Sequence, residues 1–133
     1  MDMRFYIGLV LSFLLIHQAE AIDFEKEVKP ILERRCAKCH AYGEHQGGLS
    51  MESRESLLKG GENGKVVEAG TTKGSLFLDL LVEQDSADRM PQKADKMPDE
   101  EISLLQIWVK AGLPWTEGFA FRHPKALMAP RIG

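Results

Sequence analysis

Cysteine is scarce in this chain of 133 residues: Cys36 and Cys39 are the only two. A zinc ribbon needs two pairs of ligands, so this count excludes a zinc site built from cysteines alone. It leaves three other uses of a single C-x-x-C pair open: a redox couple, a plain disulfide, or the attachment of a prosthetic group.

An excess of charge of one sign and a long apolar run are also missing. The formal net charge is −3, so nothing suggests a nucleic-acid-binding surface. The longest apolar segment, Phe5–Ile16, has twelve residues. A hydrocarbon core about 30 Å thick requires about 20 residues of helix, so this segment is too short to span a membrane comfortably.

The short apolar segment instead fits the middle of a secretory signal. Arg4 precedes it, and Ala19-Glu20-Ala21 provides small residues around a cleavage site. We therefore expect residues 1–21 to be a signal peptide, with an uncleaved anchor as the alternative. The mature chain would start at Ile22, be periplasmic or otherwise exported, and have no membrane span.

The most informative segment is Cys36-Ala37-Lys38-Cys39-His40, which has the C-x-x-C-H pattern of c-type haem attachment. Two thiols three positions apart on a helical turn can each add to one vinyl group of the same porphyrin. The following imidazole then lies under the iron as the proximal ligand. The pattern predicts one covalent haem c, held by Cys36 and Cys39, with His40 on the iron.

The competing readings of the cysteine pair are weaker. A thioredoxin-like pair follows a core strand, whereas Phe24–Arg35 is charged and helix-like. His45 and His123 could complete a zinc site, but their spacing matches no common pattern. His45 is also too close in sequence to His40 to reach the opposite face of a haem, and we interpret it as a surface histidine.

Short helical patterns separated by glycine-rich loops predict a mainly all-α fold with at most a short β piece. Asp23 caps the first pattern, and Pro30 either kinks that helix or lies in the first turn of a second one. Later helices are expected at 53–59, at 75–81 and from Pro98 to Gly112, and Val66-Val67 is the candidate extended piece. We expect a domain at residues 22–117 and a tail or linker at 118–133.

Two methionines in the loop before the last helix are candidates for the distal iron ligand. Met90 lies in a polar segment that has no core of its own, and Pro91 fixes the backbone after it. Met97 adjoins the first turn of the last helix, where an apolar residue already has a packing role. Met90 is therefore the first choice and Met97 the second, with His123 behind both.

Ile22–Glu117 resembles the planctomycete-type cytochrome c domain, a divergent class I-like cytochrome c module. The residues that carry the resemblance are Phe24–Leu32, Cys36–His40, Gly47-Gly48-Leu49, Gly70, Lys73, Ser75-Leu76, Arg89-Met90-Pro91, Asp99–Ile102, Leu105, Trp108 and Gly112. The resemblance implies a helical fold around one haem, with His40 proximal and Met90 distal. Met97 departs from the family, which usually has another apolar residue there.

The family's modules usually precede much larger domains, whereas this chain ends sixteen residues after Glu117. We therefore expect a separate redox partner protein, or a stand-alone copy of the module. The expected function is electron transfer, not enzymatic catalysis. The alternative is a gas-binding or sensing module in which Met90 dissociates; a peroxidase is less favoured, because the distal segment offers no histidine for acid–base chemistry.

The motif generates a direct prediction. Protein exported through a pathway that attaches haem should give a haem-stained band on a denaturing gel, because thioether bonds survive unfolding. Changing both Cys36 and Cys39 to Ala should abolish the band. Complete extraction of the haem by acid–acetone from the unaltered protein would contradict the prediction.

Overall fold

The computed structural model describes residues 21–122, which are mostly helical, with 42% helix and 4% strand. This content is compatible with the all-α class expected from the sequence. The expected signal peptide and His123 lie outside the described residues, except for Ala21 at the signal's end. The elements in chain order are the π-helix η1 (Phe24–Val28), α1 (Lys29–Arg35), α2 (Ala37–His40), the 3-10 helix η2 (Gln46–Gly48), α3 (Arg54–Lys59), α4 (Leu76–Leu81) and α5 (Asp99–Lys110).

The N-terminal helical segment decides between the two expectations for Pro30. The Asp23 side chain accepts a hydrogen bond from the Lys26 N–H and caps η1, as expected. Pro30 lies in the first turn of α1. Residues in the first turn of an α-helix do not need their N–H groups for bonds within that helix, so a proline is tolerated there. The helix therefore changes from one wide π turn to α geometry just before the proline and continues toward the cysteine pair.

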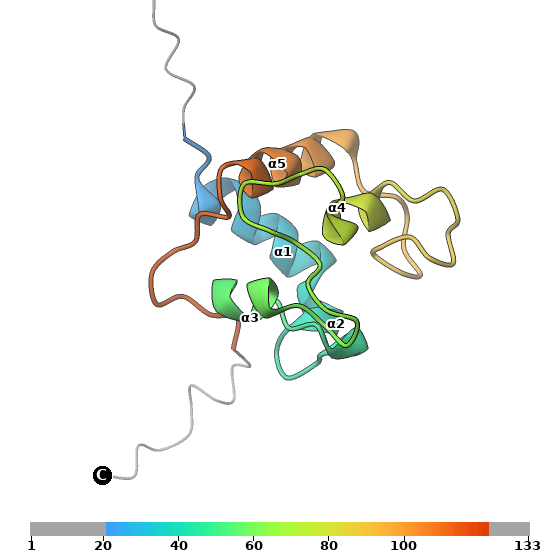
Figure 1. Cartoon of the computed structure of the whole chain (residues 1–133), viewed down its shortest axis with the longest axis horizontal. Coiled ribbons are helices and arrows are strands. Elements are labelled where there is room, and N and C mark those ends of the chain that lie inside the picture. The colour runs from blue at the N-terminus through green and yellow to red at the C-terminus, as the bar shows by residue number, and fades with distance from the viewer. Residues whose placement is uncertain (1–20, 123–133) are drawn as a thin grey trace, which may run out of the picture.

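Helix α5 crosses the N-terminal helices, as Figure 1 shows, and their contact forms the centre of the core. Trp108 is fully buried there, and its indole N–H donates to the Pro114 carbonyl at 2.8 Å. Phe24 stacks on Trp115 with ring centroids 4.3 Å apart and lies 6.4 Å from the ring of Trp108. Trp108 is therefore a core residue packed against the first helical segment.

Helices α3 and α4 begin where the sequence predicts. Ser53 caps α3 and, with Ser56, forms a reciprocal capping box. Ser75 caps α4 through a bond from the Leu78 N–H. The expected extended piece at Val66-Val67 forms no strand within the described residues; the Val66 carbonyl instead accepts from the Phe77 N–H at 2.9 Å and fixes the start of α4.

The segment that the sequence assigns to a tail is packed where it is described. Phe121 is buried, and its N–H donates to the Glu52 carbonyl at 2.8 Å. Phe119 lies with its ring 4.9 Å from that of Phe121 and 6.0 Å from that of Phe24. Two aromatic side chains spaced by one residue carry too little periodicity to predict burial, which explains why the sequence did not reveal this packing.

A contact between α3 and the end of α5 was also not predicted. The Arg54 guanidinium donates to the carbonyl groups of Gly112 and Leu113, each at 3.0 Å. These carbonyls follow the C-terminus of α5, where the helix dipole favours a positive charge. Arg54 thus joins the middle of the chain to its last helix.

Within residues 21–122, no helix is long and apolar enough to cross a membrane.

An ion-pair cluster links the start of α5 to the end of α1. We expect it to make the stability of the fold sensitive to acid. Glu101 accepts from Arg34 at 2.8 Å and from Arg35 at 2.9 Å. These bonds, led by the one from Arg35, lower the pKa of the Glu101 carboxyl. A lowered pKa stabilises the fold at neutral pH, and this contribution is lost as the pH falls through the pKa of the folded state.

Glu101→Gln should therefore lower the free energy of unfolding by about 1 kcal/mol at pH 7, because both arginines are partly solvated. The difference from the unaltered protein should shrink as the pH falls through the lowered pKa of the folded-state Glu101 carboxyl, and it should vanish once the carboxyl is protonated in both states. Urea unfolding at several pH values measures this. Glu100→Gln, an exposed neighbour without an ion pair among the described residues, is the matched control.

Candidate functional site

The cysteine pair and His40 lie on one tight turn, Cys36–His40, which we call the cysteine turn. Helix α1 ends at Arg35, Cys36 has non-helical torsion angles, and α2 begins at Ala37. The N–H groups of Cys39 and His40 both donate to the Cys36 carbonyl, at 3.2 and 3.0 Å. These backbone bonds close one tight turn that carries all three residues, which is the local arrangement that attachment and ligation of one porphyrin require.

The two thiols are free and differ in exposure. Cys36 is buried in the core, whereas Cys39 is half-buried. Burial, and secondarily the neighbouring Cys39, raises the pKa of Cys36 to about 12. The reactive cysteine of a thiol–disulfide couple is exposed and has a lowered pKa, because the thiolate is the nucleophile. Cys36 does not fit that chemistry, and the thioredoxin-like alternative loses support.

The half-buried imidazole of His40 has a fixed tautomer and orientation. Its Nδ1 lies 3.2 Å from the Leu49 carbonyl oxygen. A carbonyl oxygen only accepts, so Nδ1 carries the proton, and the lone pair of the neutral imidazole is then on Nε2. The Met51 N–H donates to the His40 carbonyl, so the loop that follows the motif returns to contact His40 a second time. An imidazole fixed in this way is prepared to bind a metal through Nε2.

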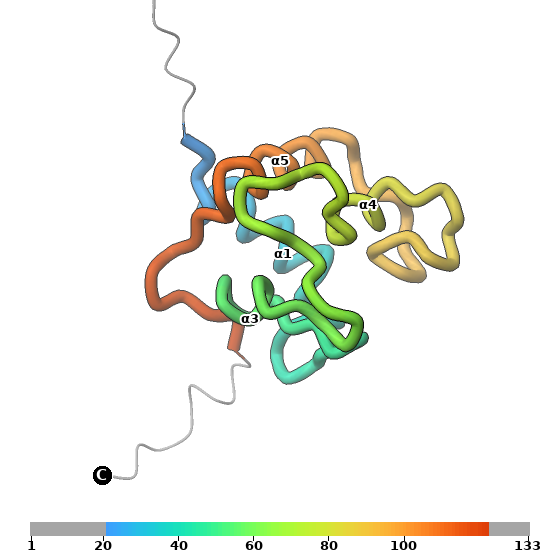
Figure 2. Tube along the Cα trace, viewed as in Figure 1, coloured from blue at the N-terminus to red at the C-terminus, as the bar shows by residue number. Residues whose placement is uncertain are grey.

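The two methionine candidates lie in the loop between α4 and α5, which Figure 2 shows projecting beside α4. Met97 is 1% exposed and belongs to the hydrophobic core. Met90 is only partly buried and packs at the edge of that core, and its N–H donates to the Leu80 carbonyl at 2.9 Å. Met97 therefore has the packing role expected for it.

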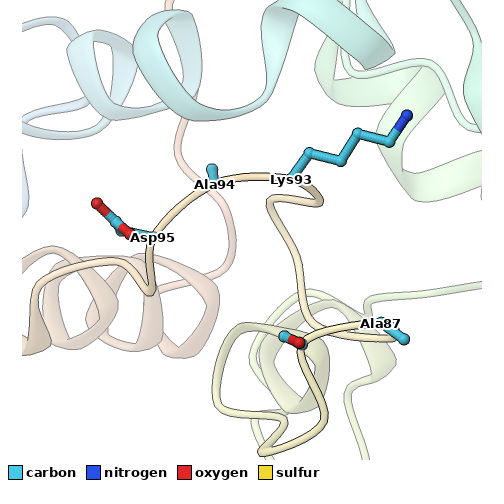
Figure 3. A pocket seen from close by; sticks show the side chains of 5 residues that line it. Ala87, Lys93, Ala94 and Asp95 are labelled. Atoms are coloured by element: carbon cyan, nitrogen blue, oxygen red, sulfur yellow. The ribbon is translucent and has the colours of Figure 1, made fainter.

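A solvent-exposed hollow lies within this loop (Figure 3). It has a volume of about 550 Å³ and is lined by Ser86, Ala87, Lys93, Ala94 and Asp95. All five lining residues are exposed.

His45 lies apart from the cysteine turn in its interactions. It is exposed, and its Nε2 lies 3.3 Å from the Glu52 carboxylate, which also accepts from the Gly43 N–H at 2.8 Å. Over residues 21–122, no group of three or more His, Cys, Asp or Glu side chains is placed to hold a metal ion. The zinc alternative thus gains no support there, and its other candidate, His123, lies outside the described residues.

Residues 36–93 match the model of the planctomycete cytochrome C family. The match supports a planctomycete-type cytochrome c domain in that part of the chain. No curated protein and no solved structure matches the chain. The resemblance inferred from the sequence is confirmed, and with it the assignment to c-type cytochromes, whose cofactor is covalent haem.

The residues of this cytochrome c domain fit a haem. Both cysteines are unpaired thiols, the form that adds to vinyl groups, and the free Nε2 of His40 is the nitrogen that an iron needs. The sequence missed the Leu49 carbonyl, because a backbone hydrogen bond across nine residues leaves no side-chain signal. The Gly47-Gly48 pair before Leu49 was the only hint of a tightly folded segment.

Proposed function

We propose that this cytochrome c domain carries single electrons through one covalently bound haem whose iron has His40 and Met90 as axial ligands. The observation that carries the proposal is the cysteine turn with its fixed imidazole. The turn presents two free thiols, and His40 keeps Nε2 available because Nδ1 donates to Leu49.

Each residue has a defined part in this proposal. Cys36 and Cys39 would form thioether bonds, and His40 would ligate the iron on the proximal side. The haem, when bound, supplies the one-electron redox chemistry. The chain contributes a fixed imidazole and a soft thioether, and Met/His ligation favours a high reduction potential. A fixed imidazole also limits the reorganisation that accompanies electron transfer.

Met90 is preferred over Met97 on grounds of burial and position. Moving the side chain of Met97 out of the core would expose apolar surface and leave a cavity, at a cost of several kcal/mol. Met90 is partly buried and lies in a loop, so its side chain can reorient at a smaller cost. The family match to residues 36–93 also includes Met90 and ends before Met97.

We further propose that the protein works outside the cytoplasm and exchanges electrons with separate redox proteins, without catalysing a reaction itself. The signal-like segment of residues 1–21 motivates the location. In the loop between α4 and α5, Lys93 and Asp95 are the charged residues that line the hollow, and both are exposed. Neither has the environment of a catalytic acid or base, which supports a carrier over a peroxidase.

The axial ligand is tested by two matched substitutions. Met90→Leu should abolish the weak sulfur-to-iron charge-transfer band of the oxidised protein and lower the reduction potential, because leucine cannot donate to iron. Met97→Leu should keep both the band and the potential and lower the stability by about 1 kcal/mol, the cost of a volume-conserving core exchange. Visible spectroscopy and redox titration measure these effects.

Carbon monoxide separates electron transfer from gas sensing. Reduced unaltered protein should bind it weakly, because Met90 occupies the iron, and Met90→Leu should bind it readily. Ready binding by the unaltered protein would favour the sensing alternative. Loss of the band in Met97→Leu alone would transfer the distal role to Met97.

A further inference from the structure

The segment that presents the Leu49 carbonyl to His40 is held by a second turn, Gly60–Gly64. The Glu62 N–H of this turn donates to the Gly47 carbonyl at 2.9 Å. The turn is closed by the Gly61 N–H, which donates to the Gly64 carbonyl at 2.9 Å. Two backbone segments therefore lie directly against each other, with no side chain between them at their closest points.

Gly61 allows this close approach. A Cβ at Gly61 would lie 2.6 Å from the Gly47 carbonyl oxygen, and 3.5 Å from both the backbone N and the Cβ of Leu49. A separation of 2.6 Å is far inside van der Waals contact, and the obstacle is backbone, which cannot rotate away as a side chain can. Any side chain at Gly61 must therefore displace the segment that contains Gly47 and Leu49.

The same contact is tight from the opposite side. A Cβ at Gly48 would lie 2.8 Å from Cγ of Glu62 and 3.0 Å from its backbone N. Here part of the obstacle is a flexible side chain, so a substitution at Gly48 would disturb the contact less than one at Gly61. The two glycines thus define one interface between the turn and the Leu49 segment.

We propose that Gly61 is a positioning residue for the proximal ligand: its lack of a side chain lets the Gly60–Gly64 turn hold the Leu49 carbonyl against His40 Nδ1. The inference rests on the proposed function, because its consequence is read at the iron. A hydrogen bond from Nδ1–H makes the imidazole a stronger donor and stabilises the oxidised iron. Displacing the carbonyl should therefore weaken the donor and raise the reduction potential.

The substitution Gly61→Ala tests this directly. Gly61 does not have a positive φ, so an alanine is compatible with its backbone torsion angles, and the effect comes from the contact with the Gly47 carbonyl. The haem-loaded variant should show a higher reduction potential than the unaltered protein. It should also show about tenfold faster solvent exchange of the His40 Nδ1 proton by NMR, as the loss of a hydrogen bond implies.

Two further glycines supply a second variant and a matched control, each with a positive φ. Gly48→Ala, at φ +72°, disturbs the same interface and should shift the potential and the exchange rate in the same direction, by less. Gly74→Ala, at φ +72° like Gly48, lies outside the Gly60–Gly64 turn and meets open space, so it should cost stability with no change in either property. If Gly61→Ala fails to fold, the pair Gly48→Ala and Gly74→Ala still decides the question.

An unchanged potential and exchange rate in folded Gly61→Ala, or in Gly48→Ala if the former does not fold, would overturn the inference. Equal shifts in Gly74→Ala would do the same, since they would trace the effect to general destabilisation. The proposed function fails separately, through the absence of covalent haem in the unaltered protein, and that result is known before any variant is compared.

Discussion

The proposed function sets one geometric constraint on the structure: two thiols and an imidazole from five consecutive residues must face the same porphyrin. One helical turn satisfies it, with the Cys36 carbonyl accepting from both Cys39 and His40. A single turn without tertiary support is not stable in water, so the rest of the chain has to hold it. Helix α1 fixes the turn from the N-terminal side, and the loop ending at Met51 fixes it from the other.

The support on the N-terminal side comes from the contact between α5 and the first helices. Phe24 and Trp108 pack together in the core, and Glu101 joins α5 to the end of α1 through Arg34 and Arg35. Arg35 immediately precedes Cys36 in the chain. The ion pairs therefore lie beside the site, and a loss of packing between α1 and α5 would be transmitted directly to the cysteine turn.

The support on the other side is made mostly of backbone. The Leu49 carbonyl orients His40, and the Gly60–Gly64 turn lies against the segment that contains Leu49. Backbone contacts of this kind exclude side chains, which gives the glycines of these loops a role beyond flexibility. The loop between α4 and α5 is different in character: its hollow is lined by exposed residues, and Met90 lies only at the edge of the core.

The starts of several helices and the cysteine motif could be predicted from the sequence, because both depend on residues that are close together in the chain. Asp23, Ser53 and Ser75 cap helices where they were expected, because capping depends on residues three positions away. The C-x-x-C-H pattern is likewise confined to five consecutive residues, so the sequence alone was enough to infer the resemblance to the cytochrome c family. Only the tertiary structure decided the roles of Arg54, Leu49 and Phe121, because their partners lie tens of residues away or are backbone atoms without a side-chain signature. It also decided the position of Pro30, because a proline is compatible both with a kink inside a helix and with the first turn of a new one.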